Sequence, residues 1–241
     1  SGHKVWRELP LWRRPPVLAA ELLVCVAVVG FFAWTALRSP PALAFQQRDW
    51  VVVGDLNNFT SDPRLDDALD TALRVELEQS RFVNVVSDLK VDDALRRMGR
   101  SANANIDRAV GSEIALREGA RALLLPSVAE VAGKLRISVE VVDPNTQTTV
   151  FAQSADGRGI GSALASLDEV ANNLRESLGE SLGSIRSNDK PLAQVTTANI
   201  DALRAYSLGL QAVREGRHKD GLAVFEEALK LDPGFAMAGI G

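Results

Sequence analysis

The most uniform pattern in the chain is an apolar run over residues 17–37, VLAAELLVCVAVVGFFAWTAL, in which Glu21 is the single charged residue. A helix of this length reaches about 30 Å, the thickness of the hydrocarbon core of a bilayer. Proline pairs that begin at Pro15 and Pro40 flank the run, and proline stops a helix. We therefore predict a transmembrane helix over residues 17–37, in contact with membrane lipid.

Basic residues predict the orientation of this helix. Four of them precede it: Lys4, Arg7, Arg13 and Arg14. After it, Arg38 and Arg48 are the nearest. Because positive charges stay on the cytoplasmic side, we expect residues 1–16 in the cytoplasm and residues after 38 in the periplasm, with the chain in a bacterial inner membrane. Two alternatives stay open, namely a signal peptide cleaved after Ala44 and a buried core helix.

Residues 48–187 combine two periodicities. Short apolar runs predict strands over residues 50–54, 82–86, 122–131, 135–141 and 149–152. Stripes of apolar residues spaced about four apart predict helices over residues 63–79, 88–98, 106–119 and 162–185. The order β-α-β-α-α-β-β-β-α predicts an α/β domain with a mixed sheet, parallel where helices cross over and antiparallel in the last hairpins.

Residues 196–238 contain two helical patterns joined around Gly216. Their small and bulky residues are spaced as in a 34-residue tetratricopeptide unit, and a generic helical hairpin is the alternative. The residues expected to pack the repeat are Leu208, Gly209, Gly216, Phe225, Ala228 and Pro233. The chain begins Ser1-Gly2 and stops soon after the second pattern. We therefore expect a fragment of a longer protein, with further repeats after it.

Composition excludes several classes of function. The formal net charge is −4 and aromatic residues make up 5% of the chain, so neither a basic field nor a stacking platform for nucleic acid is expected. Cys25 is the one cysteine, which excludes a disulfide framework and a cysteine-built metal site. His3 and His218 lie near opposite ends of the chain. We expect no catalytic residue, no metal and no cofactor in this segment.

The loop after the first strand is the candidate partner-binding loop. Its polar residues are Asp55, Asn57, Asn58, Thr60 and Asp62. Their oxygens would suit calcium, but the spacing does not match the twelve-residue calcium loop. Turn formation by the asparagines and capping of the next helix by Asp62 account for these residue types, so we expect a contact with a partner rather than a metal site.

Two stretches of sequence resemble a known family. The run VVVGDLNNFTSD at residues 51–62 and the run LEQSRFVNVV at residues 77–86 resemble the TolB-like (FlgO-like) N-terminal domain. The runs LGESL (178–182) and ALRAYSLG (202–209) look like the junction into tetratricopeptide repeats in the same proteins. The resemblance covers residues 49–238 and implies a periplasmic α/β domain followed by a repeat.

The resemblance also implies an effector. Proteins with this order carry a class III nucleotidyl cyclase, a winged-helix DNA-binding domain or a Ser/Thr kinase on the cytoplasmic side. The segment KVWRELPLWRR at residues 4–14 looks most like the cyclases of peptide-modification systems. No cyclase residue lies in this segment, so no catalytic role is carried over to any position.

We therefore predict a non-catalytic, extracytoplasmic sensing and protein-interaction portion of a single-pass membrane signalling protein. The expected partner is a protein or peptide that binds the repeat, without nucleic acid, and the sequence leaves a homo-oligomer open. One alternative is an envelope scaffold without signalling. Another is an α/β enzyme domain that binds a nucleotide or small ligand at the carboxyl ends of its strands.

Overall fold

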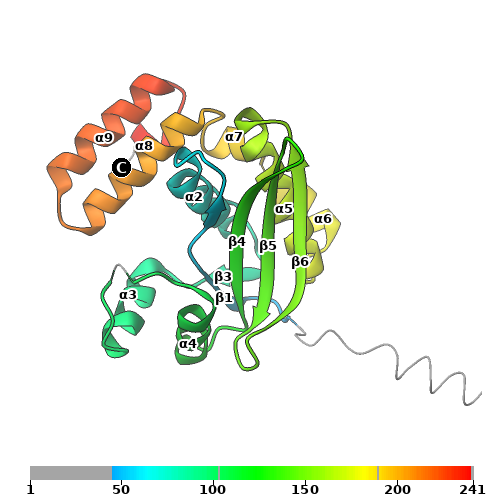
Figure 1. Cartoon of the computed structure of the whole chain (residues 1–241). Helices are drawn as coiled ribbons and strands as arrows, with labels where there is room; N and C mark the ends of the chain where they lie inside the picture. The colour runs from blue at the N-terminus through cyan, green and yellow to red at the C-terminus, as the bar shows by residue number, and fades with distance from the viewer. Residues whose placement is uncertain (1–44, 103, 189, 240–241) are drawn as a thin grey trace, which may run out of the picture. The chain divides into compact units, whose positions relative to one another are not determined.

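The computed structural model describes residues 45–239 apart from 103 and 189 (Figure 1). All the elements described here belong to one compact unit, residues 43–241. The transmembrane helix predicted over residues 17–37 lies outside the described residues and stays a prediction. Within the described part of the chain, no helix combines the length and the apolar character needed to cross a bilayer.

A mixed sheet forms the centre of this unit. Its strands are β1 (Asp49–Val53), β2 (Asn57–Phe59), β3 (Val83–Val85), β4 (Ala122–Val131), β5 (Lys134–Asp143) and β6 (Thr148–Gly157). The order across the sheet is β3-β1-β4-β5-β6, and β2 pairs with the C-terminal half of β4. The pairs β3-β1 and β1-β4 are parallel, whereas β4-β5 and β5-β6 are antiparallel hairpins. The mixed sheet predicted from the order of elements is confirmed.

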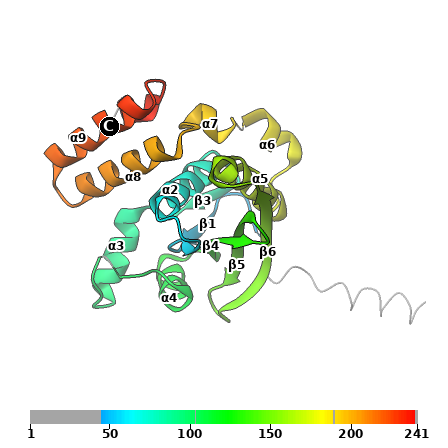
Figure 2. The ribbon, with the colours of Figure 1, turned by 45° about the horizontal axis from the view of Figure 1, so that its top comes forward.

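Helices cover both faces of the sheet (Figures 1 and 2). They are α2 (Arg64–Glu78), α3 (Asp88–Arg97), α4 (Arg108–Glu118), the 3-10 turn η3 (Ile160–Ser162) and α5 (Ala163–Ser177). Side chains of a strand alternate between faces, and β1 shows the result. Val51 and Val53 join the larger core with α2 and α5, whereas Val52 joins a smaller core with α3 and α4.

The loop predicted after the first strand contains a strand that the sequence analysis missed. Residues of β2 pair in parallel with β4, Asn57 opposite Ser127 and Phe59 opposite Ala129. Three residues are too few to show an alternation of apolar and polar positions, and Phe59 is 72% exposed. Pairing with β4 therefore comes from the surrounding fold and not from a local pattern.

The single helix predicted over residues 162–185 is wrong, because the structure divides it. Helix α5 ends at Ser177 and α6 (Leu182–Asn188) starts a new direction. Gly179 lies between them at φ 110°, a conformation that glycine adopts readily. The amides of Gly179 and Glu180 donate to the carbonyls of Glu176 and Arg175, at 3.0 Å each. This is a Schellman cap, which closes a helix and which an apolar stripe does not reveal.

A helical hairpin completes the described chain. After the short α7 (Leu192–Val195) come α8 (Ile200–Arg214), α9 (His218–Leu231) and the 3-10 turn η4 (Ala236–Gly239). The side chain of Asn199 caps α8 by accepting from the amide of Asp201 at 2.9 Å. Gly216, at φ 78°, forms the turn between α8 and α9. Whether the hairpin is a tetratricopeptide unit stays a prediction.

The hairpin packs against α2 through α8 (Figure 2). The hydroxyl of Ser207 on α8 lies 3.0 Å from the carbonyl oxygen of Asp67 and 2.7 Å from the hydroxyl of Thr71, both on α2. Arg64, at the start of α2, makes an ion pair of 3.3 Å with Asp201, at the start of α8. These contacts join two segments that lie more than a hundred residues apart in the sequence.

Candidate functional site

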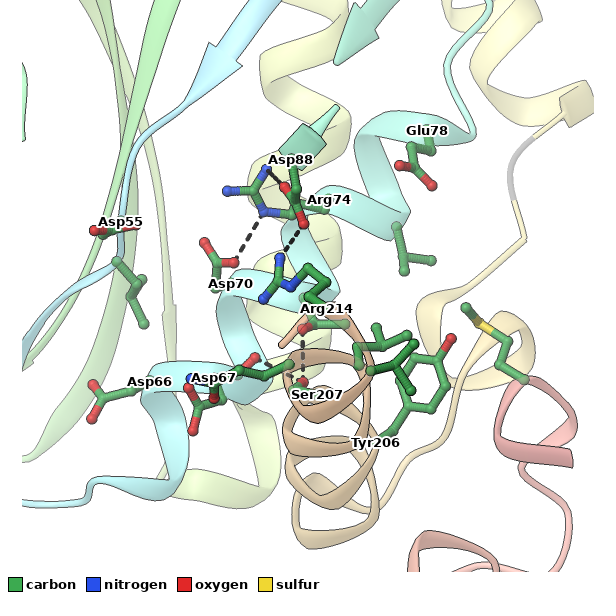
Figure 3. Close-up of a pocket in the computed structure, with 17 residues that line it drawn as sticks. Asp55, Asp66, Asp67, Asp70, Arg74, Glu78, Asp88, Tyr206, Ser207 and Arg214 are labelled. Carbon is green, nitrogen blue, oxygen red and sulfur yellow. Dashed lines mark hydrogen bonds and ion pairs between the residues drawn. The ribbon is translucent and has the colours of Figure 1, made fainter. Parts of the chain in front are cut away.

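The candidate site is a groove between α2 and α8, which we call the α2–α8 groove (Figure 3). It has a volume of about 540 Å³ and is open to solvent. Helices α2 and α8 supply most of its walls, the loop after β1 and the start of α3 close one end, and η4 adds Met237. A second cavity of about 420 Å³ shares Asp55, Asp70 and Asp88 with it and extends toward Asp92.

One wall of the groove is acidic. Its carboxylates are those of Asp55, Asp66, Asp67, Asp70, Glu78 and Asp88. Four of them belong to α2, where residues three or four apart share a face of the helix. The apolar residues of the same helix, among them Leu65, Leu69 and Leu73, are fully buried against the sheet. The packing of this apolar stripe therefore turns the acidic face of α2 toward α8.

The two guanidinium groups of the groove are bound to two of the carboxylates (Figure 3). Arg74 lies 3.0 Å from Asp70 and 3.2 Å from Asp88. Arg214 reaches across from α8 to make an ion pair with Asp88. Within the described part of the chain, no cation makes an ion pair with the remaining carboxylates: Asp55, Asp66, Asp67 and Glu78. The groove thus has an excess of negative charge.

Burial makes this excess costly. Burial raises the pKa of the Asp55 carboxyl, although that group accepts a hydrogen bond of 2.8 Å from the amide of Ile106. Burial also raises the pKa of Asp67, and the charges of Asp66 and Asp70 add to the rise against the opposing effect of Arg204. Burial is also the main cause that raises the pKa of Glu78. Three groove carboxyls are therefore harder to ionise than in water.

The facing wall is largely apolar. Its apolar side chains are Tyr206, Leu210 and Val213 of α8 and Met237 of η4, while Val75 of α2 and Leu56 of the loop after β1 add apolar surface on the acidic side. Tyr206 is held between two rings, with its ring centroid 5.5 Å from that of Phe225 and 5.1 Å from that of Phe235. Burial, followed by the charge of Glu78, raises the pKa of the Tyr206 hydroxyl, which therefore stays protonated. The groove pairs an acidic wall with a rigid apolar one.

Of the loop residues predicted to bind a partner, only Asp55 lines the groove. Asn58 and Thr60 bind within the loop, since the Asn58 side-chain oxygen accepts from the Thr60 amide at 2.8 Å and its nitrogen donates to the Asp62 carbonyl at 2.8 Å. Asp62 accepts from the amide of Arg64 at 2.9 Å, so its carboxylate serves the start of α2. Asn57 is exposed on β2. The loop is thus organised mainly by its own contacts.

The residues predicted to pack the repeat occupy different environments. Phe225 and Ala228 are buried on α9, and a side chain at Gly209 would clash with the Phe225 ring. Leu208 is 36% exposed on α8. Pro233 is exposed beyond the end of α9 and Gly216 is in the turn between the helices. None of these residues lines the groove, whereas Tyr206 and Arg214 do.

Comparison with known sequences does not assign the chain to a family. No protein-family model matches the chain, and no curated protein matches it.

Solved structures match it in part. The LpoB C-terminal domain from Salmonella enterica is 18% identical with a TM-score of 0.43, and the match covers 52% of this chain and 90% of that one. Lipoprotein GNA1162 from Neisseria meningitidis is also 18% identical, with a TM-score of 0.38, and the match covers 54% of this chain and 98% of that one. TolB from Acinetobacter baumannii is 14% identical with a TM-score of 0.36, and the match covers 57% of this chain and 30% of TolB. Likenesses this distant carry no inference about function.

Proposed function

We propose that this chain is a non-catalytic protein-interaction module of the bacterial envelope, which binds a segment of a partner protein in the α2–α8 groove. The observation that carries the proposal is the groove itself, a cavity of about 540 Å³ with one acidic and one apolar wall. Concave sites with apolar walls and a few charged groups are where proteins take up ligands. The periplasmic location follows from the predicted membrane helix and its basic flank.

The chemistry of the groove favours a protein segment over a nucleotide. A phosphate group would face the unpaired carboxylates of Asp66, Asp67 and Glu78, while Arg74 and Arg214 are held by acidic neighbours. The serine and threonine hydroxyls of the groove, Ser207 and Thr71, bind each other at 2.7 Å, and Ser207 also lies 3.0 Å from backbone carbonyls of α2 and α8, so neither hydroxyl is paired with a base as a nucleophile would be. Binding without chemistry fits this arrangement best.

Among the possible forms of this function, the groove supports that of a scaffold, which binds a partner without signalling. The predicted coupling to a cytoplasmic effector concerns residues outside the described part of the chain, and it stays a prediction. A scaffold needs only a stable binding surface. The hairpin that forms half of the groove is fixed to α2 by hydrogen bonds and one ion pair, and to α3 by the ion pair between Arg214 and Asp88.

Site-specific photocrosslinking in cells tests the proposal. A photoreactive residue replaces Gln211, which lines the groove, and in a matched strain it replaces Ser154, which is exposed on β6. We expect a defined protein adduct from position 211 and none from position 154, and the crosslinked protein, once purified, should bind the full chain. Absence of an adduct at position 211, or the same adducts from both positions, would contradict a binding role for the groove.

A further inference from the structure

The charge of the groove limits the kind of segment that it accepts. Six carboxylates face two guanidinium groups, and both guanidinium groups are already paired with Asp70 and Asp88. Charges in a partly buried site are screened by salt much less than charges in water. A ligand that brings positive charge therefore gains attraction along the acidic wall, and a ligand that brings negative charge is repelled.

Two further features show that the carboxylates of the acidic wall are only partly compensated by their present neighbours. Oδ1 of Asp70 is buried and has no hydrogen-bond partner within the described residues, and such an acceptor is costly unless a donor reaches it. Burial raises the pKa of Asp55, Asp67 and Glu78, which means that their ionised forms are disfavoured in the empty groove. An incoming ammonium or guanidinium group beside Asp67 or Glu78 would favour the ionised forms of these carboxyls.

Arg214 shows how such a group is accommodated. Its guanidinium comes from α8, crosses the groove and binds Asp88, whose other oxygen binds Arg74 at 3.2 Å (Figure 3). The groove thus already holds one arginine side chain from the far wall. Positions near Asp66, Asp67 and Glu78 offer the same chemistry to a cation of a partner.

The apolar wall excludes a bare cation as the ligand. Leu210 and Met237, which are both partly exposed, would remain in water if a metal ion or a simple polyamine were bound. The carboxylates are also spread along the helix, and no three metal-ligating side chains converge within the described chain. A ligand that satisfies both walls carries cations on one side and apolar groups on the other.

The spacing of the acidic wall matches a helix. Asp66 and Asp70 lie four residues apart on α2, and Glu78 follows eight residues after Asp70. Four residues of a helix advance about 6 Å along its axis. An amphipathic helix with lysine or arginine at every fourth position presents its charges at the same interval. Helices with an apolar face are a common occupant of grooves between helices.

Resting on the proposed function, we propose that the occupant of the α2–α8 groove is a basic amphipathic helix of a partner protein. Its lysine or arginine residues lie along Asp66, Asp67 and Glu78, and its apolar face packs on Tyr206, Leu210 and Met237.

Binding of a synthetic helix tests this proposal. The probe is a fluorescein-labelled 18-residue peptide with lysine on one face and leucine on the other, titrated with the full chain in phosphatidylcholine nanodiscs and read by anisotropy. Empty nanodiscs report binding to lipid. The variant D66N/D67N removes two groove charges, and E130Q/E226Q removes two exposed carboxylates outside the groove. All three proteins share the same lipid, so lipid binding cancels between them.

We expect D66N/D67N to weaken binding roughly 30-fold, because two charge pairs with the peptide are lost, and we expect E130Q/E226Q to change it less than twofold. Affinity should also fall as salt rises. Three results would overturn the proposal. They are equal affinity of the peptide for both variants, equal binding of a sequence-scrambled peptide, and displacement of the peptide by spermine with an affinity similar to that of the peptide itself. If photocrosslinking at position 211 still captures a partner, the proposed function survives that failure.

Discussion

The sharpest prediction concerns a buried ion pair that fixes the end of α2, one wall of the groove. Arg175 on α5 is fully buried and binds Glu180, whose side chain is 2% exposed, at 3.0 Å. Ser80, directly after α2, donates its hydroxyl to the same carboxylate at 2.6 Å, and Ser184 on α6 donates at 2.9 Å. Although burial opposes ionisation of Glu180, these donors hold the pKa of its carboxyl below the ordinary value. The network joins α5, α6 and the segment after α2.

Replacing Arg175 with methionine removes the cation and leaves a buried carboxylate with fewer donors. Breaking a buried ion pair on one side costs about 3–5 kcal/mol, because the remaining charge is uncompensated. In a folded unit of residues 43–241, each kcal/mol corresponds to about 2–4 °C in Tm. We therefore expect R175M to lower Tm by roughly 6–20 °C.

The double variant R175M/E180M separates this cause from a simple loss of packing. With both charges gone, we expect a loss of only about 1–2 kcal/mol, chiefly because the hydroxyls of Ser80 and Ser184 lose their acceptor. Urea and thermal unfolding, followed by tryptophan fluorescence, measure the free energy of unfolding of each variant. If R175M lies within 1 kcal/mol of the parent, or if R175M/E180M is as unstable as R175M, the reasoning is refuted.

Two other variants give clear outcomes. Asp67→Asn should raise Tm at pH 7. The pKa of Asp67 is raised in the folded chain, so ionisation of this carboxyl opposes folding above that pKa. Thermal scans near pH 3, below the ordinary pKa of 3.8, should therefore show no gain in Tm. A loss of stability at pH 7 would contradict this sign. Gly209→Ala should cost about 1–3 kcal/mol by forcing a methyl group into the Phe225 ring, and F225L should recover part of the loss in urea unfolding. Independent effects of the two substitutions would argue against that contact.

Much of the sheet followed from local patterns. The alternation of Leu135, Ile137 and Val139 with polar residues predicts β5, and all three are buried as that pattern requires. The run at β1 predicts a strand covered on both faces, as observed for Val51 and Val52. Apolar period is a reliable signal where one face of an element meets a core.

Other features depend on contacts that the sequence does not show. The break between α5 and α6 arises because Glu180 folds back onto Arg175, and the apolar stripe continues across it through Leu178. The groove was missed for a related reason. The dipole of α2 accounts for Asp66 and Asp67, which lie in its first turn, but not for Asp70 or Glu78. The signal available was the acidic face of α2 as a whole.

The contrast between the two acidic sites supports a binding role for the groove. Glu180 is buried and receives donors from Arg175, Ser80 and Ser184, so its ionised form is stabilised by the fold. For Asp67 and Glu78 the charges of Arg204 and Arg74 do not offset burial, and the pKa values of both carboxyls are raised.

A purely structural helix would not need these charges, because serine or asparagine would keep the same surface polar without electrostatic cost. Residues that oppose stability at a concave junction are characteristic of sites that bind a ligand. Here the junction brings together α2 and α8, and its ion pair Arg214–Asp88 joins residues 126 apart in the sequence. The unpaired carboxylates are therefore best explained by a cation that arrives with the partner.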